Sequence, residues 1–258
     1  MIIEVEKLCF GYGSHKVLND ISFNVGKGKL ISIIGPNGVG KSTLFRCILG
    51  LIGEYSGIIR IEGNDIKKLS AKSRAHLMAY IPQIHYPSFN YSVMDMVLMG
   101  TAHQLSAYSK PGKKEMEQAW KALAQLNITG LAQRGFSRLS GGKQQLVLIA
   151  RALAQQAGII LMDEPTSSLD FGNQLRVLQQ IKNLTKEGYT VLISMHNPQH
   201  ALTYSDYILA LFDGSIIADG TPQEVINKDL LSRLYNVEVQ IAKVGGDMLI
   251  VPSGERRS

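Results

Sequence analysis

The sequence predicts an α/β fold built around a parallel β-sheet, and three observations support this prediction. Apolar runs at 30–34, 159–162 and 191–194 are typical of strands that are buried on both faces of a sheet. The first of these runs leads through a glycine-rich loop into a helical pattern. The later half of the chain alternates strand and helix, which is the order of a parallel sheet. With 258 residues and 45% hydrophobic content, the chain can build one such core.

The expected strands follow in order along the chain. Apolar and polar residues alternate over 2–9 and again over 17–25, as in two half-buried strands of an antiparallel edge sheet. Apolar runs predict further strands at 30–34, 58–61, 78–81, 159–163, 190–194 and 207–212. Two short segments, 237–243 and 248–251, flank Gly245-Gly246 and predict a terminal hairpin. The polar last residues, 253–258, are expected to fray.

The helical patterns lie between these strands. From 92 to 126 the apolar spacing is helical apart from a Lys-Pro-Gly break at 110–112, so this stretch predicts a helical insert. Further helices are expected after Ser140 and over 174–187. The run Thr221-Pro222-Gln223-Glu224 predicts a short helix, because Thr caps, Pro suits the first helical position and Glu lies three residues after the cap.

The loop after the strand 30–34 is a P-loop. Its glycines carry no Cβ, so the backbone can curl around a polyphosphate with the N–H groups pointing inward. The lysine then supplies charge to the β- and γ-phosphates and the serine a hydroxyl to Mg²⁺, at the positive end of the following helix. A plain glycine-rich turn is the alternative, and the strand-loop-helix context disfavours it. The predicted cradle comprises Gly35, Pro36, Asn37, Gly38, Val39, Gly40, Lys41, Ser42 and Thr43.

Two further clusters have the composition of a phosphate site. The strand 159–162 runs into Asp163, suited to Mg²⁺, and Glu164, suited to act as general base on a water molecule. A solvated acidic turn is the alternative. In Leu139-Ser140-Gly141-Gly142-Lys143, the serine can cap a helix and the glycines leave its first N–H groups free for an anion. This second anion site suggests a nucleotide held between two copies, although an ordinary capped helix explains the residues equally well.

These motifs resemble one family, the nucleotide-binding subunits of ABC transporters. The resemblance covers nearly the whole chain, with the motifs in the family's order. Residues 35–43 resemble the Walker A loop, 139–143 the signature, and Asp163-Glu164 the end of the Walker B strand. The remaining matches are Tyr12 in Phe10-Gly11-Tyr12-Gly13, Gln83 after Tyr80-Ile81-Pro82, the D-loop Ser167-Ser168-Leu169-Asp170, and the switch histidine His196.

The resemblance implies a role for each matching residue. Tyr12 is expected to stack on adenine, and Ser42, Gln83 and Asp163 to hold Mg²⁺ beside ATP. Glu164 is expected to polarise the attacking water, His196 to stabilise the γ-phosphate, and Gln83 to report its loss to the membrane partner. Two copies are expected to close head to tail over two ATP molecules. Further nucleotide contacts are expected from Ser140, Gly141, Gly142, Lys143 and Asp170.

The resemblance also implies a domain organisation. A P-loop NTPase (RecA-like) core with a parallel sheet is expected to cover 1–83 and 140–236, with an antiparallel β subdomain. An α-helical subdomain is expected at 84–139, and a hairpin with a tail at 237–258. Three aromatics just after Gln83, in the run 84–91, suit either a groove for the transmembrane partner or the insert's own core.

This chain departs from the family at two positions. The signature usually ends in Gln where this chain has Lys143, and the switch histidine is commonly followed by Asp where it has Asn197. Both changes alter charge near the γ-phosphate or the dimer seam. They affect the expected turnover and the nucleotide-dependent dimer affinity, but not ATP binding itself.

The expected function is ATP hydrolysis that drives an ABC importer. The stretches 91–100, 148–155 and 196–201 look most like ATPases that import iron chelates, haem or cobalamin, and a molybdate-type oxyanion stays open as cargo. The expected partners are an integral membrane permease and, indirectly, a substrate-binding protein. Another transport system or a soluble ABC ATPase is the alternative, although the long coiled coils or tandem domains of the soluble class do not occur here.

Charge and hydropathy bear on location and partners. The net charge is +6, but Lys and Arg are scattered, so no nucleic-acid partner is expected. No apolar run approaches the eighteen or so residues of a membrane span, and the first residues lack a basic signal-peptide region. The chain is expected to lie peripherally on the cytoplasmic face of the inner or plasma membrane. Cys9 and Cys47 fit no metal or redox spacing.

Overall fold

The computed structural model describes residues 1–83, 89–106 and 109–253 of the chain. Its central sheet has the strand order β10-β9-β3-β8-β7-β6. From β9 to β6 the strands run parallel, and β10 pairs antiparallel with β9 at one edge. The predicted parallel α/β sheet is thus confirmed. The strands are β3 (Leu30–Ile34), β6 (Met78–Ile81), β7 (Ile159–Asp163), β8 (Thr190–Met195), β9 (Tyr207–Phe212) and β10 (Ser215–Gly220).

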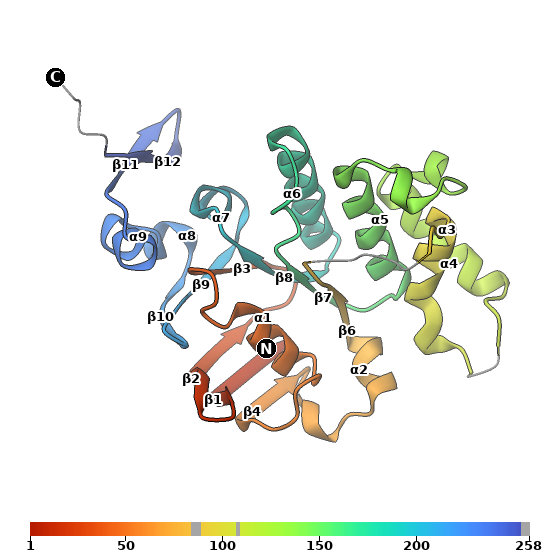
Figure 1. Cartoon of the computed structure of the whole chain (residues 1–258), viewed down its shortest axis with the longest axis horizontal. Helices are drawn as coiled ribbons and strands as arrows, with labels where there is room; N and C mark the ends of the chain where they lie inside the picture. The colour runs from red at the N-terminus through yellow and green to blue at the C-terminus, as the bar shows by residue number, and fades with distance from the viewer. Residues whose placement is uncertain (84–88, 107–108, 254–258) are drawn as a thin grey trace.

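A second, antiparallel sheet lies beneath helix α1 (Lys41–Ile48), at the bottom of Figure 1. Its strand order is β2-β1-β4-β5, and every neighbouring pair is antiparallel. The two alternating segments near the start of the chain form its first two strands, as predicted. The strand expected at 58–61 belongs to this sheet as well. The strands are β1 (Ile3–Tyr12), β2 (His15–Val25), β4 (Ser56–Ile61) and β5 (Asn64–Asp65).

The helices cover the central sheet and extend it at one end. Figure 1 shows α6 and α7 above the sheet and α3, α4 and α5 together beyond β6. Helix α6 begins three residues earlier than the sequence predicted, because Asp170 caps it by accepting a hydrogen bond from the backbone N–H of Asn173 (2.9 Å). The helices are α2 (Ala71–Leu77), α3 (Val93–Leu98), α4 (Lys113–Gln125), α5 (Gly141–Ala154), α6 (Phe171–Lys186), α7 (Pro198–Tyr204), α8 (Pro222–Val225) and α9 (Lys228–Tyr235).

Two hydrophobic clusters form the core, one on each face of the central sheet. In β3, Ile31 and Ile33 pack into the cluster shared with α1 and the antiparallel sheet. Leu30 and Ile34 pack into the opposite cluster, shared with α3 to α9. Because side chains alternate along a strand, a strand buried on both faces must be apolar at nearly every position. This is why the parallel strands were visible as continuous apolar runs.

The helical insert begins where the sequence predicted. Ser92 caps α3, and it exchanges hydrogen bonds with Asp95 in a capping box. Helix α5 packs against α3 and α4 as well as against β6, so it joins the helical layer to the sheet. Of the three aromatics expected after Gln83, Tyr86 falls in 84–88, outside the described residues. Phe89 is 70% exposed, whereas Tyr91 packs partly against the core.

The predicted terminal hairpin is present as β11 (Val239–Val244) and β12 (Asp247–Pro252). The side chain of Gln199 on α7 binds this hairpin through two hydrogen bonds. Its Nε2 donates to the carbonyl of Met248 (3.1 Å), and its Oε1 accepts from the N–H of Ile250 (2.8 Å). The fraying expected over 253–258 falls almost wholly outside the described residues. Within the described ranges, every helix is too short or too polar to cross a bilayer.

Candidate active site

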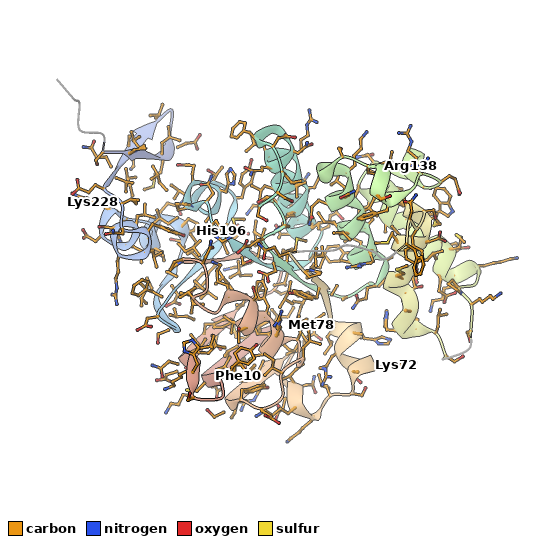
Figure 2. The ribbon with its side chains drawn as sticks, viewed as in Figure 1. Phe10, Lys72, Met78, Arg138, His196 and Lys228 are labelled. Atoms are coloured by element: carbon orange, nitrogen blue, oxygen red, sulfur yellow. The ribbon has the colours of Figure 1, made fainter. Side chains whose placement is uncertain are left out.

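Four neighbouring strands of the central sheet deliver the predicted site residues to one edge. The P-loop follows β3, His196 follows β8, Asp163 ends β7 with Glu164 just after it, and Gln83 lies just after β6. Parallel strands end at the same edge, so segments far apart in sequence meet there. Figure 2 labels His196, which lies at the middle of the molecule above the sheet.

The P-loop backbone depends on its glycines. Gly35, Gly38 and Gly40 have φ angles of 151°, 77° and 108°, which other residues rarely adopt. A Cβ on Gly35 would lie 2.2 Å from the carbonyl oxygen of Leu211, so the loop passes directly against β9. Gly40 is the N-cap of α1, and Ser42 and Thr43 stand half-buried in the first turn of that helix.

Lys41 folds back onto its own loop. Its Nζ donates to the carbonyl of Gly35 (2.8 Å) and to that of Pro36 (2.9 Å), and the residue is only 4% exposed. Burial lowers the pKa of Lys41, while the nearby carboxylates of Glu164 and Asp163 act in the opposite direction. The lysine is therefore within electrostatic reach of both acids that end β7, and its ammonium points into the loop.

One oxygen atom joins the three residues expected to act in catalysis. Oε2 of Glu164 accepts a hydrogen bond from Nε2 of Gln83 (2.6 Å) and pairs with Nε2 of His196. The Glu164 side chain is only 10% exposed. Its backbone has a φ of +48°, an uncommon conformation for a residue with a side chain and one that occurs often at functional sites. The structure thus places the expected general base between the expected sensor and the switch histidine.

Asp163 is held in place by residues that the sequence did not single out. It is 3% exposed and accepts a hydrogen bond from Oγ of Ser194 (2.6 Å), while the same Oγ accepts from the N–H of Glu164 (2.8 Å). The Tyr80 hydroxyl also contacts Asp163, and burial together with this carboxylate raises the pKa of Tyr80 to about 12. The sequence gives no sign that Ser194 supports Asp163, because a serine in an apolar strand is not distinctive. The contact arises because Asp163 and Ser194 are paired across β7 and β8.

A cavity of about 190 Å³ borders Glu164 and His196. His200, in the first turn of α7, forms part of the wall of this cavity and is 8% exposed. Burial lowers the pKa of His200, which favours a neutral imidazole near neutral pH. The cavity places a second histidine close to the predicted reaction centre.

Asn197, the departure from the family after the switch histidine, has a structural task. Its Oδ1 accepts hydrogen bonds from the N–H groups of Gln199 (2.9 Å) and His200 (3.4 Å), so it caps α7. An aspartate can cap a helix equally well. The asparagine therefore preserves the local structure that the family's aspartate would provide.

Two substitutions test this capping role. Asn197→Asp is expected to leave the free energy of unfolding nearly unchanged, because the cap is kept. Asn197→Ala is expected to cost about 1 kcal/mol, the usual loss for a missing N-cap. Urea denaturation of both variants measures the difference, and equal stability of the alanine and aspartate variants would contradict a capping function.

The signature residues and the D-loop form a second cluster. A Cβ on Gly141 would lie 3.1 Å from Cδ2 of Leu169, and one on Gly142 only 2.6 Å from Cγ of Asn173. Hydrogen bonds from Asn173 lower the pKa of Asp170. Ser140 is the N-cap residue of α5 as predicted, but its hydroxyl accepts no capping hydrogen bond in the described chain, and Lys143 in the first turn is exposed.

Tyr12 ends β1 and is 51% exposed. Its ring meets that of Phe10 edge to face, with centroids 4.8 Å apart, and Figure 2 shows Phe10 on the antiparallel sheet. An exposed ring supported from one side suits stacking on a base. The stacking role itself stays a prediction.

Comparison with known proteins agrees with this geometry. The family model described as ABC transporter matches residues 18–167. A Helicobacter pylori protein named "Probable iron chelatin transport ATP-binding protein" is 37% identical, over 93% of this chain and 95% of its own. The iron(3+)-hydroxamate import ATP-binding protein FhuC of Bacillus subtilis is 34% identical, over 93% of this chain and 89% of its own.

A solved structure extends the likeness to three dimensions. It is described as an inward-facing conformation of a metal-chelate type ABC transporter, and it has a TM-score of 0.86 and 32% identity, covering 97% of this chain and 96% of its own. The sequence match spans more than half of the chain, and the fold match spans nearly all of it. The chain therefore belongs to the ABC transporter family, as one of its ATP-binding subunits, which hydrolyse ATP.

Proposed function

We propose that this ATPase drives uptake of a metal chelate through a partner membrane permease, using the residues that meet at Glu164. The observation that supports the site most directly is the convergence of Gln83 and His196 on Oε2 of Glu164. A carboxylate held by an amide and an imidazole beside a P-loop has the composition needed to orient and deprotonate a water molecule.

In the proposed reaction, ATP lies along the P-loop with its adenine against Tyr12. Lys41 gives up its hydrogen bonds to the two loop carbonyls and donates to phosphate oxygens instead. Hydrogen bonds between an ammonium and a charged oxygen are stronger than those to a neutral carbonyl. Glu164 takes a proton from the attacking water, His196 donates to the γ-phosphate, and Gln83 reports the loss of the γ-phosphate to the membrane partner. Lys41, Glu164, His196 and Gln83 all lie at the same edge of the central sheet.

Three oxygen-bearing residues are suited to hold Mg²⁺ at this site: Ser42, Gln83 and Asp163. The buried carboxylate of Asp163 and a hydroxyl at the start of α1 are donors that Mg²⁺ prefers. A Mg²⁺ ion bound by these residues would neutralise part of the phosphate charge. The protein residues then position the water and the phosphate.

We further propose that two copies close head to tail over two ATP molecules. Each nucleotide lies between the Lys41 loop of one copy and Ser140, Gly141, Gly142 and Lys143 of the other, with Asp170 beside them. Within one copy the two anion sites have different surroundings: the P-loop lies against Leu211, whereas the signature glycines lie against α6 and the D-loop. The two segments thus pack against different elements, which is compatible with a nucleotide shared between copies.

The names of the relatives support the proposed cargo and location. Names that refer to iron chelatin and iron(3+)-hydroxamate support a metal chelate as cargo, with iron-siderophore, haem and cobalamin as members of that class. The chain would then work at the cytoplasmic face of the membrane, bound to permease subunits that receive cargo from a substrate-binding protein. A molybdate-type oxyanion, and another transport system, are the competing proposals.

Co-purification and uptake test this function together. A tagged chain, isolated in detergent from its own host, is expected to bring with it an integral membrane protein with many transmembrane helices. Deleting the chain is expected to abolish uptake of radiolabelled ferric siderophore, and a plasmid copy restores it, whereas one with Glu164→Gln does not. Unchanged siderophore, haem and cobalamin uptake in the deletion strain would contradict a chelate importer.

A further inference from the structure

The signature turn, Ser140 to Gly142, lies directly against the first turn of α6 in the same copy. A Cβ on Gly142 would be 2.6 Å from both Cγ and Oδ1 of Asn173 and 3.0 Å from its Cβ. Real Cβ atoms do not approach other atoms so closely, so residue 142 must lack one while Asn173 keeps its position. Gly142 is accordingly buried, unlike its neighbour Gly141.

Backbone conformation does not explain glycine at this position. Gly142 lies inside α5, and its φ is outside the positive range that favours glycine. Glycine within a helix is less favourable than alanine. Close approach by another group is the usual compensation, and in this structure that group is the Asn173 side chain.

Asn173 is itself fixed by the D-loop. Its backbone N–H donates to Oδ1 of Asp170 (2.9 Å), and its Nδ2 donates to Oδ2 of the same carboxylate (2.7 Å). Both oxygens of Asp170 are thus engaged by one residue. An atom that displaces the Asn173 side chain therefore also breaks the hydrogen bond from Nδ2 to Asp170, and leaves only the backbone N–H bond.

The next residue connects this contact to the reaction centre. Nε2 of Gln174 donates to the carbonyls of Leu169 in the D-loop (3.0 Å) and of Thr166 just before it (3.2 Å), so this side chain ties the D-loop to α6. Gln174 also lines the cavity beside Glu164 and His196. Because Oγ of Ser167 in the D-loop donates to the carbonyl of Glu164 (3.1 Å), the D-loop connects Glu164 to the first turn of α6, which lies against the signature turn.

We propose that Asn173 is a positioning residue that holds the signature turn and Asp170 as one rigid unit, and that residue 142 is glycine to accommodate Asn173. This inference rests on the proposed function, in which both segments face the partner's nucleotide. A change at the D-loop when one site reacts then moves the turn that closes the other site. The two sites of the dimer hydrolyse ATP cooperatively through this contact.

The first test measures ATP-dependent dimerisation in a Glu164→Gln background, by light scattering at increasing ATP concentration. Gly142→Ala is expected to raise the ATP concentration for half-maximal dimer about tenfold, the effect of one overpacked contact. Asn173→Ala removes the crowding atoms Cγ and Oδ1. In the presence of Asn173→Ala, the change Gly142→Ala is therefore expected to have little further effect.

Asn183→Ala is the matched control, because it makes the same change on the same helix, ten residues after Asn173. It is expected to dimerise like the parent. Gly142→Ala could raise the ATP concentration for half-maximal dimer by the same factor whether residue 173 is Asn or Ala. The glycine would then be needed for close approach of the phosphate, and the inference would be wrong, although the dimer mechanism would stand. If the Glu164→Gln chain itself never dimerises with ATP, the proposed function fails instead.

A second measurement does not depend on any change at Gly142. In the otherwise unaltered chain bound to its permease, Asn173→Ala is expected to lower the Hill coefficient for ATP hydrolysis toward 1, while Asn183→Ala leaves it unchanged. A purely structural role for Asn173 would lower the amount of folded protein but not the cooperativity. An unaltered Hill coefficient would therefore overturn the proposal.

Discussion

Glu164→Gln is expected to lower the rate of ATP hydrolysis by about 10²- to 10⁴-fold, the usual contribution of a positioned general base. The glutamine oxygen can still accept the hydrogen bonds that Oε2 receives from Gln83 and His196, so the local structure is kept. Glutamine also tolerates the φ of +48° at this position as well as glutamate does. What the change removes is the ability to take a proton from water.

The same variant is expected to accumulate as a closed dimer with ATP, because the P-loop and Lys41 are untouched and the reopening step is blocked. Phosphate release and size-exclusion chromatography with light scattering measure the two effects. Glu187→Gln is the matched control: this glutamate pairs with Gln125 at the far end of α6 and is expected to change neither result. Hydrolysis by Glu164→Gln at the parent rate would show that another group is the base.

The parts of this site that the sequence could predict are those set by neighbouring residues. Glycine spacing and a preceding apolar run were enough to place the P-loop, because both the φ angles and the strand are local properties. The edge shared by Lys41, Gln83, Glu164 and His196 followed from a general rule, that parallel strands end together. Here the order of strands β3, β8, β7 and β6 agrees with that rule.

The parts that could not be predicted depend on register and on packing between distant segments. Ser194 supports Asp163 only because β7 and β8 pair in one particular register, and nothing in an apolar strand reveals it. The contact between Gly142 and Asn173 likewise depends on how α5 meets α6. The sequence suggested a phosphate contact for this glycine, and only the structure shows the side chain that fills the adjacent space.

Lys41→Ala is expected to weaken ATP binding by about 1.5–3 kcal/mol, the range for a hydrogen bond to a charged group, which corresponds to a dissociation constant roughly 10- to 150-fold higher. In the free protein, the ammonium is buried and satisfied by two loop carbonyls. When ATP binds, the ammonium replaces its hydrogen bonds to the two neutral carbonyl oxygens by hydrogen bonds to charged phosphate oxygens. This replacement is what favours binding. Fluorescent-nucleotide titration in the presence of Mg²⁺ measures the loss.

Lys67→Ala is the control for this change, because it separates the loss of phosphate contacts from the loss of a hydrogen bond between a lysine and a backbone carbonyl. Nζ of Lys67 also donates to a backbone carbonyl, that of Tyr55 (2.8 Å), and lies 4.0 Å from the centroid of the Tyr55 ring, in the antiparallel subdomain. Removing it deletes the same kind of hydrogen bond without touching the P-loop, so nucleotide affinity is expected to stay constant. Equal affinity losses in both variants would mean that Lys41 acts only by supporting the fold, and unchanged affinity in Lys41→Ala would contradict the phosphate cradle.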